Sequence, residues 1–146
     1  MKIAVHITEK LMYDWPLCYW KELLGKLTKA GHDVYLFSDE LTVRIDDSNP
    51  KLHDKLHLPD DQSEEEIGKC DLFIGFPLKY ARMAAKCGVK TILMLGATNK
   101  GDGVKTTAPC GGCVDNVPGQ NDCMYAGDQL CLWEITPNDV MCLVNA

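Results

Sequence analysis

Short apolar runs alternate along the chain with segments whose apolar residues recur every three or four positions. Two such runs, at 71–75 and 90–96, end at a glycine. Continuous apolar runs of this length are typical of strands buried on two faces of a sheet. The residues between them fall at helical spacing: Leu78, Ala81, Ala84 and Ala85, with Gly88 at the expected left-handed C-cap. The stretch from Cys70 to Thr98 therefore predicts a strand, a helix and a second strand joined by a right-handed parallel crossover.

The first part of the chain repeats this arrangement. Residues 3–7 read as a strand, and Pro16 suits the first turn of a helix that ends near Gly31. The stripe of that helix is Leu17, Trp20, Leu24 and Leu27. A second strand is expected at 33–38. Two helix–glycine–strand joints of one type indicate a doubly wound sheet.

The middle of the chain has a weaker pattern, because Pro50 and Pro59 interrupt any long element. Residues 55–58 are a candidate third strand. Ser63 followed by Glu66 forms a capping-box pattern, which predicts a brief helix beginning there and ending near Gly68.

Residues 99–131 are rich in Gly, Pro, Thr and Cys and are too long for a simple connection. Behind them, Thr136 is positioned to cap a helix, Pro137 to occupy its first turn and Asp139 to complete a capping box. A C-terminal helix is therefore expected at 136–144.

At 146 residues, with 46% hydrophobic residues, the chain fits one α/β domain spanning 1–146. We expect a Rossmann-like three-layer fold with five or six mostly parallel strands, plus the cysteine-containing C-terminal segment. The net charge of −6 argues against a nucleic-acid-binding surface. No run is long enough to span a membrane and the first residues read as a strand, so the expected location is the cytoplasm.

In open parallel sheets ligands bind at the carboxyl ends of the strands, which here are followed by the turns 75–79 and 96–100. Lys79 and Arg82 lie three apart at the start of a helix, where the free amides and the dipole favour an anion such as phosphate. They could equally be ordinary surface residues. Further candidates for the rim of the site are Gly75, Lys10, Tyr13, Thr98 and Asn99.

Four of the eight cysteines, Cys110, Cys113, Cys123 and Cys131, have a spacing that can close a tetrahedral zinc site. Such a four-thiolate site is structural, and free thiols or disulfides are the alternatives. Cys18, Cys70, Cys87 and Cys142 fall in predicted helices or strands and are expected to be buried.

The order of these segments resembles the C-terminal, nucleotide-sugar-binding half of the ADP-heptose:lipopolysaccharide heptosyltransferases, glycosyltransferase family nine. The resemblance covers nearly the whole chain. It rests on Trp15-Pro16, on LLGKLTKAGHDVYLFSD, on the unit from Cys70 to Thr98, and on the cysteines followed by CLWEITPNDV. It implies one half of a B-type glycosyltransferase, with a nucleotide or nucleotide-sugar phosphate as ligand.

The family carries an Asp-Thr/Ser-Gly-x-x-His motif facing the donor diphosphate. Pro77, Leu78, Lys79 and Arg82 occupy the corresponding places here. The acceptor-binding half is also missing, so we expect the chain alone to be inactive and to need an acceptor-domain partner for transfer. The alternatives are a non-catalytic protein that binds a nucleotide-like ligand and an interaction module with a vestigial site.

Overall fold

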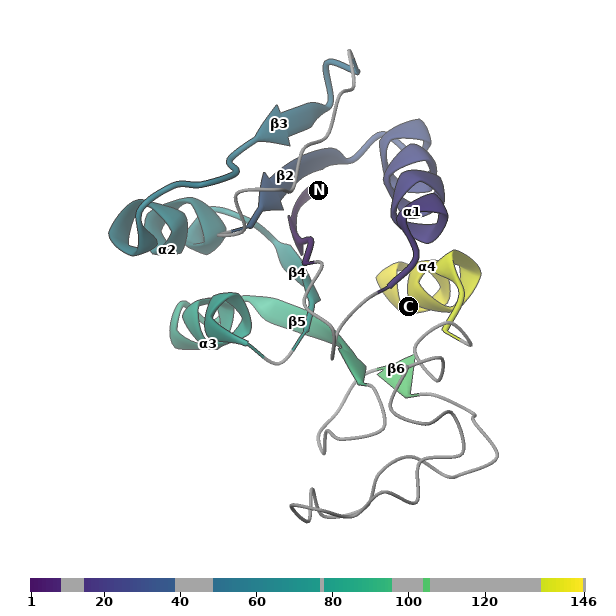
Figure 1. Cartoon of the computed structure of the whole chain (residues 1–146). Helices are drawn as coiled ribbons and strands as arrows, with labels where there is room; N and C mark the ends of the chain where they lie inside the picture. Colours follow the sequence, from purple (N-terminus) through teal and green to yellow (C-terminus); the bar gives the residue numbers. More distant parts are fainter. Residues whose placement is uncertain (9–14, 39–48, 77, 96–103, 106–134, 146) are drawn as a thin grey trace.

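The computed structural model of the chain describes residues 1–8, 15–38, 49–76, 78–95, 104–105 and 135–145. The described part has the element order β1-α1-β2-β3-α2-β4-α3-β5-β6-α4 (Figure 1). The six strands are β1 Lys2–His6, β2 Asp33–Phe37, β3 Leu52–Asp54, β4 Leu72–Gly75, β5 Lys90–Leu95 and β6 Val104–Lys105. The helices are α1 Leu17–Lys29, α2 Asp60–Gly68, α3 Lys79–Lys86 and α4 Pro137–Val144.

The strands form one parallel sheet in the order β3-β2-β1-β4-β5-β6. From β1 the chain moves outward to β2 and β3, and then returns to place β4 on the other side of β1. The order therefore reverses between β1 and β4, which are paired in register from Ile3 opposite Leu72 to Val5 opposite Ile74. In open parallel sheets such a reversal is the usual place for a ligand.

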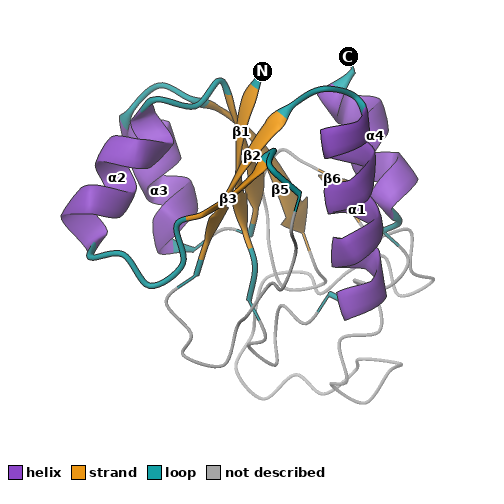
Figure 2. Cartoon of the chain, turned by 90° about the horizontal axis from the view of Figure 1, so that it is seen from above, coloured by secondary structure: helices purple, strands orange, loops and turns teal. Residues whose placement is uncertain are grey.

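One face of the sheet is covered by α1 and α4 (Figure 2). Alternate residues of β1, such as Ile3 and Val5, point to this face because side chains alternate along a strand. They pack against the apolar stripe of α1, which includes Trp20 and Leu27. Most of the apolar core lies in this layer.

The opposite face is covered by α2 and α3 (Figure 2). Ala4 and Phe73 point to this side from the two central strands, and Ile67, Tyr80 and Ala84 pack on them from the helices. The predicted three-layer α/β domain is therefore confirmed for the described residues, with six parallel strands.

The end signals read from the sequence are present at several elements. Gly31 and Gly88 follow α1 and α3 with φ of 93° and 73°, the left-handed region in which glycine carries no side-chain penalty. Thr136 and Asp139 form a capping box at the start of α4, each bonding the other's backbone N–H. Local chemistry thus sets these boundaries.

The prediction for β3 was wrong by three residues. The strand is Leu52–Asp54 rather than 55–58, because the paired residues run from Leu52 opposite Val34 to Asp54 opposite Leu36 of β2. Lys55, just beyond the strand, still donates its N–H to the Leu36 carbonyl at 3.0 Å. His57 ends the extended path with φ of 64°, and its N–H donates to the Ser38 carbonyl at 2.8 Å. A pairing partner distant in sequence therefore decides the position of this short edge strand.

The predicted start of the next helix was also wrong. It begins at Asp60, after Pro59, and Ser63 is a buried residue inside it. Pro59 has φ of −56°, and Asp60 and Asp61 place acidic charge in the first turn, where the helix dipole favours it. Ser63 donates its hydroxyl to the Leu58 carbonyl at 3.3 Å, so it does not cap the helix. Among the described residues no helix is long and apolar enough to cross a membrane.

Candidate functional site

The candidate site lies where β1 and β4 end side by side. Ile7 and Thr8 follow β1, and Phe76 follows Gly75 at the end of β4. Thr8 is 1% exposed and lies two residues beyond β1. Lys10 and Tyr13 were the residues predicted to bind in the loop after this strand, and Thr8 was not among them. These chain ends form the floor of the site.

Two helices begin at this edge, because α1 follows β1 and α3 follows β4. Their N-cap residues, Pro16 and Leu78, have no side-chain hydrogen-bonding group, and neither helix has an acidic residue in its first turn. The amides of the first turn have no partner within an α-helix, and the dipole places partial positive charge there. Both helix starts therefore favour an anion at the sheet edge.

Gly75 has a packing role that is visible in the structure. A Cβ built at this position would lie 2.9 Å from the Cβ of His6 and 2.9 Å from Cζ of Phe73. The space that a side chain would take is thus filled by neighbours on the same face of the sheet. Gly75 was predicted from the sequence as a residue at the rim of the site, and the structure adds this packing constraint.

His6 belongs to the core between the sheet and α3. It is 2% exposed, and its ring centroid lies 4.6 Å from that of Tyr80 and 6.3 Å from that of Phe76. Tyr80 is itself 1% exposed. This aromatic packing fixes the start of α3 against the end of β1 and so holds the two sides of the site together.

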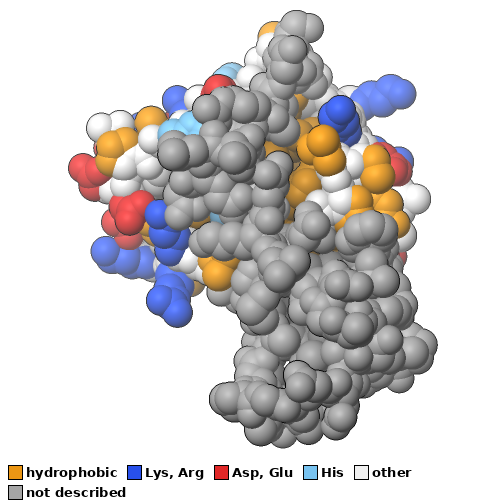
Figure 3. All heavy atoms as spheres, in the orientation of Figure 1, with side chains coloured by type: hydrophobic (Ala, Val, Ile, Leu, Met, Phe, Trp, Pro, Cys, Tyr) orange, Lys and Arg blue, Asp and Glu red, His pale blue; other side chains and the backbone are white. Residues whose placement is uncertain are grey.

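Lys79 is the first residue of α3, which is the position predicted from the sequence for a residue that binds phosphate. Its Nζ lies 3.0 Å from Oδ1 of Asp60, the first residue of α2, and 5.2 Å from the centroid of the Tyr80 ring. Charged side chains of both signs gather over α2 and α3 (Figure 3). Asp60 was not recognised from the sequence, although in this topology α2 and α3 begin at the same sheet edge.

Arg82 lies one turn further along α3 and is exposed. In the described part of the chain it has no ion-pair partner, unlike Lys79 and Lys86 of the same helix. Its guanidinium is therefore available to a ligand. The structure brings Gly75, Lys79 and Arg82 to one region.

The other predicted binding residues, Lys10, Tyr13, Thr98 and Asn99, lie outside the described residues. The same holds for the four cysteines of the proposed zinc site, Cys110, Cys113, Cys123 and Cys131. Their roles stay predictions.

Of the four cysteines that were predicted to be buried, only Cys70 is buried. Cys70 is 7% exposed, whereas Cys18, Cys87 and Cys142 are exposed, because they face outward on or after their helices. Burial raises the pKa of the Cys70 thiol to about 11, with a smaller contribution from the Asp71 carboxylate. Cys70 is thus a structural residue with little thiolate at neutral pH.

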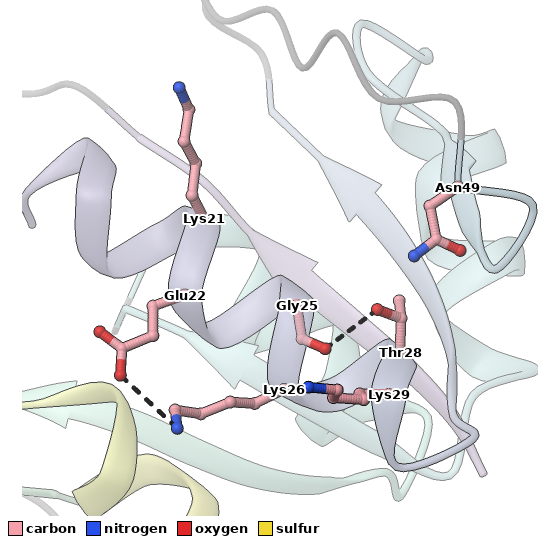
Figure 4. A pocket seen from close by; sticks show the side chains of 7 residues that line it. All are labelled: Lys21, Glu22, Gly25, Lys26, Thr28, Lys29 and Asn49. Carbon is pink, nitrogen blue, oxygen red and sulfur yellow. Dashed lines mark hydrogen bonds and ion pairs between the residues drawn. The ribbon is translucent and has the colours of Figure 1, made fainter.

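An open groove of about 530 Å³ lies elsewhere, on the outer side of α1 (Figure 4). Lys26 in this groove pairs with Glu22 at 3.6 Å. The lining residues are Lys21, Glu22, Gly25, Lys26, Thr28, Lys29 and Asn49. Asn49 precedes β3, so the groove lies toward the amino edge of the sheet and away from the candidate site.

Neither a protein-family model nor a curated protein sequence matches the chain. Solved structures do resemble it. The iron-containing dodecameric glycosyltransferase TibC of enterotoxigenic Escherichia coli matches with a TM-score of 0.74 and 16% identity, over 99% of this chain and 45% of TibC. The E. coli heptosyltransferase WaaC, solved with ADP-2-deoxy-2-fluoro heptose, matches with a TM-score of 0.72 and 14% identity, over 99% and 42% of the two chains.

E. coli ADP-heptose lipopolysaccharide heptosyltransferase II gives a TM-score of 0.72 at 16% identity and covers 99% of this chain. The chain spans between 42% and 45% of the length of these three proteins. The resemblance read from the sequence is therefore confirmed for the fold, which is that of one half of a heptosyltransferase.

Proposed function

We propose that the chain binds a nucleotide or nucleotide-sugar phosphate at the carboxyl edge of its sheet, as a heptosyltransferase-like donor-binding domain. The observation that carries this proposal is the match of 99% of the chain to half of proteins solved with ADP or ADP-heptose. Those ligands are bound by the relatives. The reversal of strand order between β1 and β4 supports the proposal, because ligands of open parallel sheets usually bind at such a point.

The chemistry of this edge supports an anionic ligand. The start of α3 offers amide donors, Lys79 a compact positive charge and Arg82 a planar fork that can hold two phosphate oxygens. In the resemblance to the family motif, Lys79 stands at the place of the glycine and Arg82 at the place of the histidine. We infer that the diphosphate lies against the first turns of α3.

Transfer of a sugar requires an acceptor and a group that removes the acceptor's proton. The chain has the fold of only one half of the relatives, so we propose that it holds the donor side and that an acceptor-domain protein supplies the other. The chain alone is then inactive in sugar transfer.

We also propose that Cys110, Cys113, Cys123 and Cys131 hold one structural zinc ion. Four thiolates satisfy the tetrahedral preference of zinc and leave no open position for water. Binding of the metal to the ordered chain alone would stabilise a segment with little apolar sequence of its own.

Calorimetric titration with ADP tests the binding proposal, with the wild-type chain, the double variant Lys79→Ala/Arg82→Ala and the control Lys86→Ala. Lys86 is a basic residue at the far end of the same helix, paired with Glu64 at 3.1 Å. Each lost charged hydrogen bond should cost about 1.5–3 kcal/mol, so the double variant should bind at least tenfold more weakly and the control should match wild type. Equal affinity in all three proteins would remove α3 from the site.

A further inference from the structure

We propose that Asp60 competes with the ligand phosphate for Lys79, so that this carboxylate limits the affinity of the site for anions. The inference rests on the proposed function, because it concerns the same phosphate position. Its basis is the distance of 3.0 Å between Lys79 Nζ and Asp60 Oδ1. In the ligand-free protein the ammonium expected to bind phosphate is already paired.

The topology explains why these two residues meet. Asp60 is the first residue of α2 and Lys79 the first of α3, and the two helices lie side by side on one face of the sheet (Figure 2). Both helices follow strands and begin at the carboxyl edge. The acidic charge that complements the dipole of α2 is thereby placed beside the helix start that is expected to bind an anion.

The pair is exposed enough to exchange partners. The side chain of Asp60 is 66% exposed and that of Lys79 is 38% exposed, so a released carboxylate turns into water rather than into the core. Exposed ion pairs are weak, which means that a phosphate can displace Asp60 at small cost. The ring of Tyr80 lies 5.2 Å from Lys79 Nζ and stabilises the ammonium in the ligand-free protein.

The neighbouring acids of α2 differ from Asp60. Asp61 makes no ion pair with the described residues, and Glu64 pairs with Lys86 at the far end of α3. Glu65 and Glu66 pair with Lys69, the residue that follows α2. Asp61 is therefore a matched control for Asp60, since it has the same charge in the same helical turn without the contact to Lys79.

The test is titration with ADP of the wild type, Asp60→Asn, Asp61→Asn, Lys79→Met and the double variant Asp60→Asn/Lys79→Met. Loss of the competing Asp60 carboxylate should tighten ADP binding by Asp60→Asn about two- to fivefold, the range of one exposed ion pair. Asp61→Asn should change the affinity less. In the Lys79→Met background, Asp60→Asn should lose most of its effect, because no ammonium is left for which Asp60 and the phosphate compete.

Tighter binding that depends on Lys79 supports the proposal. Unchanged affinity for ADP in Asp60→Asn, or the same gain in affinity in Asp61→Asn, would overturn the competition between Asp60 and phosphate. The proposed function would still stand in either case, provided that the wild type binds ADP. Weaker binding by Asp60→Asn would overturn the competition by showing that the carboxylate contacts the ligand. Absence of ADP binding in all five proteins would overturn both the competition and the proposed function.

Discussion

The last residues of the two central strands, His6 and Gly75, leave no room between them for a side-chain carbon. A Cβ at Gly75 would lie 2.9 Å from the Cβ of His6, closer than real Cβ contacts allow. Because His6 also packs on Tyr80 at the start of α3, this contact links the ends of β1 and β4 to the helix expected to bind the ligand. The floor of the site is thus fixed by packing.

Replacing Gly75 with alanine should therefore lower the free energy of unfolding by about 1–3 kcal/mol, the usual cost of overpacking a core. Denaturant unfolding followed by circular dichroism measures this value. The control is Gly25→Ala, at an exposed position inside α1 where a Cβ meets no atom within 4 Å. That change should raise stability by about 0.5–1 kcal/mol, because alanine favours the helix. A Gly75→Ala variant as stable as the wild type would refute the packing account.

The buried thiol of Cys70 should react slowly with alkylating reagents in the folded protein. Its pKa, raised by burial from an ordinary value of 9.0 to about 11, makes its thiolate fraction about a hundredfold smaller than that of an unperturbed thiol. Cys18, Cys87 and Cys142 are exposed and should be labelled first. Peptide mapping after timed treatment with iodoacetamide separates the sites, and labelling of Cys70 at the rate of Cys18 would contradict its burial.

Elemental analysis of protein prepared without added metal tests the zinc site. The expected result is about one zinc per chain, with all eight thiols free after denaturation without reductant. Binding should weaken in acid, since the ligands must be thiolates. If no metal is found and four thiols are missing, two disulfides take the place of the zinc ion. If neither zinc nor a disulfide is found, the prediction of a zinc site is wrong.

Patterns local in sequence predicted much of this fold. The apolar runs around Ile3, Leu72 and Ile92, the glycine after α3 and the capping box at Thr136 can each be read from a few consecutive residues, and each predicted a feature that the structure has. Residue order along the chain likewise indicated the doubly wound sheet. The resemblance to the heptosyltransferases followed from the order of these segments.

Features that depend on distant residues could not be predicted in this way. The position of β3 is decided by its pairing with β2, as Leu52 opposite Val34 shows. The contact between Lys79 and Asp60 joins two helices, and the crowding at Gly75 comes in part from β1. For the candidate site, sequence therefore indicated Lys79 and Arg82 but not the partner of Lys79.

Incubation of the chain with ADP-heptose and a lipopolysaccharide acceptor should give no sugar transfer. The reason is that a B-type transferase reacts between two domains, and this chain has the fold of one half. Mass spectrometry of the acceptor measures the product, with a complete heptosyltransferase as the positive control. Repeated turnover by the 146-residue chain alone would overturn the requirement for a second domain.

The most direct test of the central claim is an amide nuclear magnetic resonance titration of the isotopically labelled chain with ADP. The largest shifts should fall on residues 7–8, 75–76 and 78–82, where β1 and β4 end and α3 begins. The amides of 21–29, along the groove on α1, should remain nearly unchanged. Shifts centred on that groove, or no shifts at a large excess of ADP, would contradict ligand binding at the carboxyl edge of the sheet.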